Sequence, residues 1–140
     1  MHKLTITISL AAAVAALALS GATASAKPIK SAGLVTCSGQ AQVKPTDYTL
    51  FCGDGNDTLA KLHWHRWGHR SATATGVDGV NLCQPSCVAG KLKNFTVAVT
   101  ASKLSSGDYH LLTIHFNDHI PPGLHRTEKF KVSSVGPVIQ

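Results

Sequence analysis

Apolar and polar residues alternate along much of the chain after residue 33, as they do in half-buried β-strands. The clearest case is residues 95–101, in which Phe95, Val97 and Val99 alternate with threonine and alanine. In a strand this alternation places the apolar set on one face. Similar runs, rich in threonine, valine and aromatic residues, occupy residues 48–52, 59–67, 71–76, 110–116 and 127–132.

Clusters of glycine, proline, aspartate and serine separate these runs and indicate turns. They occur at residues 44–47, 53–56, 78–79, 105–108 and 121–123. Short strands between frequent turns predict an all-β fold, an antiparallel β-sandwich of about six or seven strands. A partly closed β-barrel is the alternative.

The N-terminal segment has the three parts of an export signal. A basic head that includes Lys3 precedes a long apolar run, and Ala24 and Ala26 are the small residues that a signal peptidase reads. A retained membrane anchor is the alternative, but it would need about 20 strongly apolar residues. We therefore expect residues 1–26 to be cleaved, residues 27–33 to be a flexible tether and residues 34–140 to form a single β domain.

Four cysteines follow the predicted cleavage position, and an even number in an exported chain indicates two disulfides. Three pairings are possible in principle. We expect the sequence neighbours to pair, Cys37 with Cys52 and Cys83 with Cys87. A zinc site is the alternative, but the spacings do not follow the C-x2-C pattern of structural zinc sites.

The chain carries a formal net charge of +6. Its lysines are spread along the sequence, which is typical of a soluble basic surface rather than of a dedicated nucleic-acid site. We expect an extracellular ligand or protein as the partner, no specific nucleic acid, and no membrane association after signal cleavage.

Several motifs together resemble a family of small secreted actinobacterial proteins without an assigned function. In chain order they are Cys37, Cys52-Gly53-Asp54-Gly55, Leu62-His63-Trp64-His65-Arg66-Trp67, a small-residue strand at residues 72–76, and Cys83-Gln84-Pro85-Ser86-Cys87. The resemblance covers most of the chain after the export signal and implies secretion and a β fold. Members of the family do not usually carry histidine at the positions of His63 and His65.

Histidines provide weak candidates for a metal site. His63 and His65 are two residues apart, so on a strand they share a face and could bind one zinc or copper ion. His69 follows closely, and His115, His119 or His125 could add a ligand if their strand pairs nearby. The alternative is that these are ordinary exposed polar residues, and we commit to no metal ligand and no cofactor.

Trp64 and Trp67 are predicted to lie on opposite faces of one strand. Trp64 would then join Leu62 in the core. Trp67 would share the face of His63 and His65, where it could be an exposed platform for a carbohydrate or a peptide.

No recognisable catalytic constellation is present. The chain lacks a G-x-S-x-G elbow, its cysteines are assigned to disulfides, and Glu128 is the only glutamate. The sequence therefore favours a non-enzymatic extracellular binding domain. The alternatives are a histidine-dependent metal-binding protein and a secreted protease inhibitor that presents the loop between Cys83 and Cys87.

Overall fold

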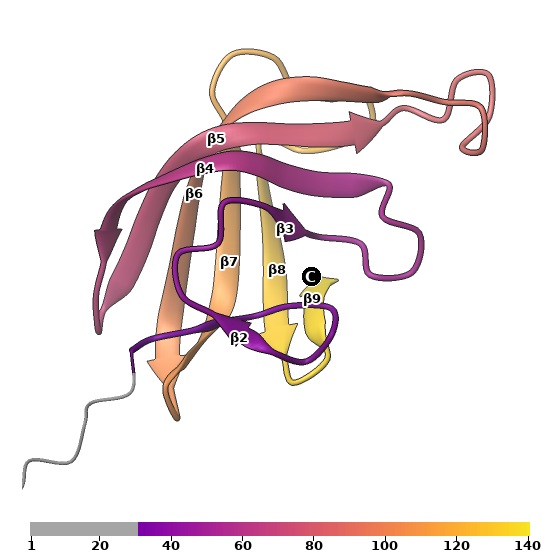
Figure 1. The fold of residues 1–140 in the computed structure, drawn as a ribbon. Helices are drawn as coiled ribbons and strands as arrows, with labels where there is room; N and C mark the ends of the chain where they lie inside the picture. The colour runs from indigo at the N-terminus through magenta and orange to yellow at the C-terminus, as the bar shows by residue number, and fades with distance from the viewer. Residues whose placement is uncertain (1–30) are drawn as a thin grey trace, which may run out of the picture.

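The main sheet is a chain of antiparallel hairpins in which every strand pairs with its neighbour in sequence. The computed structural model describes residues 31–140, so the predicted export signal lies outside the described residues. The seven strands, in spatial as well as sequence order, are β3 (Tyr48–Thr49), β4 (Asp57–Trp67), β5 (Ser71–Asn81), β6 (Leu92–Ser105), β7 (Asp108–Phe116), β8 (Thr127–Ser133) and β9 (Gly136–Ile139). The sheet curls into a half-barrel (Figure 1).

A second, two-stranded sheet consists of β1 (Leu34–Val35) and β2 (Ala41–Gln42). β1 lies against β7 and β8. Its two residues are buried in the core, and the Tyr48 hydroxyl donates a hydrogen bond of 2.6 Å to the Val35 carbonyl oxygen. Burial raises the pKa of this phenol.

The predicted all-β fold with two disulfides is confirmed, and the described residues contain no helix. The architecture is the partly closed barrel rather than two stacked sheets. Cys37 pairs with Cys52 and Cys83 with Cys87, as expected from their sequence neighbourhood. The first bridge ties the β1–β2 turn to the turn between β3 and β4.

The core fills the inside of the curled sheet. Val97 and Val99 of β6, predicted to share an apolar face, are at most 1% exposed, and Ile114 of β7 is fully buried beside them. Tyr109, Phe116 and Phe130 are the largest of the fully buried side chains. This agreement follows from the period of two, which the sequence displays directly.

Two expected boundaries were wrong. Ala32 and Gly33, predicted to end a flexible tether, are buried, and Gly33 exchanges backbone hydrogen bonds with Gly107 and Tyr109. The predicted turn at Asp78 and Gly79 lies inside β5, which continues to Asn81. Asp78 stays in the strand because its side chain faces the interior and is 1% exposed.

Candidate functional site

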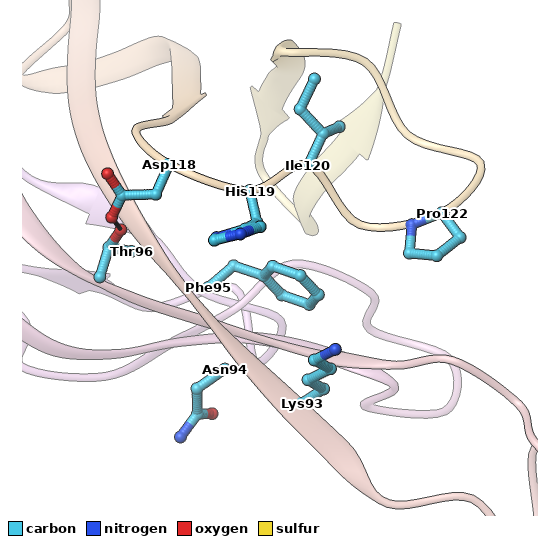
Figure 2. Close-up of a pocket in the computed structure, with 8 residues that line it drawn as sticks. All are labelled: Lys93, Asn94, Phe95, Thr96, Asp118, His119, Ile120 and Pro122. Atoms are coloured by element: carbon cyan, nitrogen blue, oxygen red, sulfur yellow. Dashed lines mark hydrogen bonds between the residues drawn. The ribbon is translucent and has the colours of Figure 1, made fainter.

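A groove opens where β6 extends beyond its neighbour β7. We call it the β6 groove; it has a volume of about 420 Å³ and is lined by residues 93–96 of β6 and by Asp118, His119, Ile120 and Pro122 of the loop after β7. In Figure 2, Phe95 points from β6 toward this loop. The volume falls within the range of about 300–1,000 Å³ that small-ligand sites occupy.

The floor of the groove is aromatic and fixed in place. Phe95 is 6% exposed and packs edge to face against Phe116, with ring centroids 6.1 Å apart. The Lys93 ammonium nitrogen lies 5.7 Å from the centre of the Phe95 ring. Lys93 is itself exposed, so a positive charge and an apolar surface meet at the same place.

Hydrogen bonds hold the loop that forms the opposite wall. The Thr96 hydroxyl donates to Asp118 Oδ2 at 2.7 Å, drawn as a dashed line in Figure 2. The Arg126 guanidinium donates to the carbonyl oxygens of Phe116, Asn117 and Asp118 at 2.8–3.3 Å. These bonds fix the start of the loop, and Ile120 remains 38% exposed above the groove.

Three acidic side chains are buried inside the half-barrel: Asp57, Asp78 and Glu128. Asp78 is the cross-strand partner of Phe95, so this cluster lies beside the floor of the groove. Burial, followed by a hydrogen bond to Asp57 and the charge of Asp57, raises the pKa of Asp78 to about 9. Burial also raises the pKa of Asp57, and the charge of Glu128 adds to this.

The two aspartates therefore share a proton at neutral pH, with Asp78 as the donor to Asp57. Within residues 31–140, Oδ1 of each of them has no hydrogen-bond partner. Glu128 accepts a hydrogen bond of 2.6 Å from the His125 backbone N–H. Sequence reasoning missed this cluster, because Asp57 and Asp78 both stand beside typical turn residues.

The histidine candidates are only partly brought together. His63 and His65 are exposed, with ring centroids 5.0 Å apart, while His69 lies in the turn between β4 and β5. His63 and His115 share one line across the sheet, through Thr75 and Ala98. They are three strand spacings apart, about 14 Å, which is too far for one ion.

Within the described part of the chain, no group of three or more histidine, cysteine, aspartate or glutamate side chains could hold a metal ion. We therefore expect micromolar zinc to leave the Tm of the protein unchanged, because two imidazoles without a further protein ligand make a weak site. Saturation at a hundredfold excess over Kd would stabilise the fold by about 2.7 kcal/mol. A clear rise in Tm that disappears in the His63→Ala/His65→Ala double variant would contradict this expectation.

Trp67 does not share the face of His63 and His65, contrary to the prediction. Bulges in β4 between Ala60 and His63 and between Trp64 and Arg66 break the period of two. Both tryptophans pack against the core and contact each other at a centroid distance of 4.5 Å. The Trp67 indole N–H donates to the Ala32 carbonyl oxygen at 2.8 Å. This side chain therefore packs inside the fold and is not an exposed binding platform.

The loop closed by Cys83 and Cys87 projects from the end of the barrel (Figure 1). Gln84, Pro85 and Ser86 are exposed, and Val88 is 100% exposed. Asn81 anchors the base of the loop: its amide nitrogen donates to the Cys87 carbonyl oxygen and its amide oxygen accepts from the Cys83 N–H. The sequence identified the loop but not its anchor.

No family model, curated protein or solved structure matches this chain. The resemblance to small secreted actinobacterial proteins stays a prediction. The two disulfides are typical of proteins in an oxidising compartment. Among residues 31–140, no helix is long and apolar enough to cross a membrane.

Proposed function

We propose that this protein is an exported, non-enzymatic binding domain that holds an anionic, partly apolar ligand in the β6 groove. One observation carries the proposal: the exposed ammonium group of Lys93 stands beside the rigid aromatic floor of a groove of about 420 Å³. Sites that combine an apolar surface with a few placed polar groups are the usual form of small-ligand sites. Export by removal of residues 1–26 belongs to the same proposal and predicts Lys27 as the mature N-terminus.

The groove is suited to binding rather than to catalysis. Asp118, its acidic residue, is engaged by the Thr96 hydroxyl. Asp78, one of the proton-sharing aspartates, is the cross-strand partner of Phe95 and is almost completely buried. A catalytic acid or base must come within hydrogen-bond reach of its substrate, and neither member of this buried pair is among the residues that line the groove.

Binding of 8-anilinonaphthalene-1-sulfonate, an anionic aromatic probe, tests the proposal. We expect Lys93→Gln and Ile120→Ser each to weaken binding by about fivefold, which corresponds to roughly 1 kcal/mol for loss of a solvent-exposed charge pair or a small apolar contact. Isothermal titration calorimetry on the folded protein measures the affinity.

Two exposed residues on other strands provide matched controls. Lys129→Gln removes a positive charge from β8, and Val138→Ser removes an apolar side chain from β9. Both variants should bind the probe like the parent protein. If all four variants bind equally, the probe does not occupy the β6 groove and the proposal is wrong.

The protease-inhibitor hypothesis remains a second proposal, supported by the projecting loop and by its anchor at Asn81. A loop that is held in shape before binding loses less entropy when a protease takes it up. Inhibition of secreted serine proteases by the parent protein, but not by a Cys83→Ser/Cys87→Ser variant, would favour it. Absence of inhibition at micromolar protein would remove it.

A further inference from the structure

The β6 groove lies along a stretch of sheet edge that has no strand partner. β5 pairs with β6 from Leu92 onward, but the ladder between β6 and β7 begins only at Val97. Residues 92–96 of β6 therefore overhang β7. The loop after β7 makes one backbone hydrogen bond to this overhanging segment, from the Asn117 N–H to the Thr96 carbonyl oxygen.

That hydrogen bond also establishes which backbone groups face the groove. Backbone N–H and C=O groups of successive residues in a strand point to alternate sides. The backbone groups of Thr96 point to the β7 side, so those of Asn94 and Leu92 do as well. The backbone groups of Lys93 and Phe95 point to β5. Within residues 31–140, no hydrogen bond joins the backbone of Asn94 or Leu92 to the loop across the groove.

We infer that the β6 groove binds an extended peptide that adds a strand to the overhanging edge of β6. The inference rests on the proposed function and names the class of ligand. Main-chain hydrogen bonds to Asn94 would supply affinity, and the side chains along the groove would supply specificity, as in other cases of strand addition.

The side chains that line the β6 groove indicate which peptide sequence would bind there. Phe95 and Lys93 are two residues apart in β6 and share one face, and Ile120 lies on the loop across the groove from them (Figure 2). An antiparallel peptide would place an apolar side chain against Phe95 and, two residues later, an acidic side chain beside Lys93. Pairing with a second copy of the chain is less favourable, because full overlap of two antiparallel β6 edges places each Lys93 opposite Phe95 of the other copy and leaves it without an acidic partner.

The experiment uses a fluorescein-labelled peptide with the sequence Thr-Leu-Thr-Glu-Thr, in which leucine and glutamate share one face of a strand. Fluorescence anisotropy with the parent protein measures binding. Replacing glutamate with lysine should weaken binding at least tenfold. Exchanging leucine and glutamate should weaken it similarly, because antiparallel pairing then places each side chain against the wrong partner.

Two N-methylated peptides separate strand addition from simple occupation of the groove. The central threonine would lie opposite Asn94 with its N–H pointing to β6, so methylation there should abolish binding. The N–H of the leucine would point away from the edge, so methylation there should change affinity less than threefold. Equal binding of the two methylated peptides would overturn strand addition.

On the protein side, Asn94→Pro removes the backbone N–H that faces the groove without removing a ladder bond to β5. This variant should lose the peptide, whereas Asn94→Ala, which keeps the backbone N–H, should still bind it. If Asn94→Pro does not fold, the methylated peptides on the parent protein still decide the question.

Failure of the two proposals is distinguishable. Binding of the probe without any binding of the peptide would overturn the inference and leave the proposed function standing, whereas loss of both would overturn both. Dimerisation of the parent protein that Asn94→Pro abolishes would assign the edge to a second copy and so overturn the peptide assignment.

Discussion

Raising the pH from about 5 to about 9 is expected to lower the free energy of unfolding, because the folded state retains a proton that the unfolded chain releases. In the folded protein the pKa of Asp78 lies at about 9, whereas an unfolded aspartate titrates near pH 4. The folded state therefore binds more protons than the unfolded state throughout this window. Stability should fall as the pH rises, by up to about 1.4 kcal/mol per pH unit for one proton.

Asp78→Asn should flatten this dependence, because the amide can still donate to the Asp57 carboxylate but carries no titrating proton. We expect the variant to be more stable than the parent protein at pH 8 and close to it at pH 5. Urea unfolding at several pH values measures both slopes.

Asp47→Asn is the matched control, since Asp47 is exposed and hydrogen-bonds only its neighbour Thr46 among the described residues. It should leave the slope of the parent protein unchanged. Identical slopes for the parent protein and Asp78→Asn would mean that the buried aspartates do not share a proton.

Loss of the bridge between Cys37 and Cys52 is expected to destabilise the fold more than loss of the bridge between Cys83 and Cys87. The two bridges span sequence separations of 15 and 4 residues. Their effect on the entropy of the unfolded chain is worth about 3 and about 2 kcal/mol, respectively.

Native contacts increase the difference between the bridges. A Cβ placed on Gly136 would lie 3.1 Å from Cys52 Sγ, so the first bridge packs closely against the start of β9. The second bridge closes a loop that projects into solvent.

Urea unfolding of Cys37→Ala/Cys52→Ala and of Cys83→Ala/Cys87→Ala compares the two bridges directly. The first double variant should have the lower unfolding midpoint. The reverse order would show that the projecting loop is coupled to the core more strongly than its position indicates.

These predictions depend on features that the sequence displays to different degrees. The alternation around residues 95–101 predicted a buried face correctly, because the period of two is a local property of an extended chain. The pairing of Cys37 with Cys52 was also predictable, because short separations in sequence keep two side chains near each other.

The sequence was a poorer guide wherever the strand departed from regularity. Asp78 and Gly79 have the composition of a turn, yet they continue β5 because the Asp78 carboxyl is accommodated inside the barrel beside Asp57. Trp67 was assigned to the wrong face, because the bulge between Trp64 and Arg66 shifts the alternation by one residue.

The sequence by itself determined the β class, most of the strands, the two disulfides and the identity of the projecting loop. Each of these follows from residues that are close together along the chain. Only the tertiary structure decided that the Asp57 and Asp78 carboxyl groups are in contact and that His63 lies three strands from His115. It also decided that β6 extends past the end of β7 beside Ile120. Those relations depend on register, bulges and the curvature of the sheet. Because these arise from contacts between distant segments, no periodic pattern of apolar and polar residues predicts them.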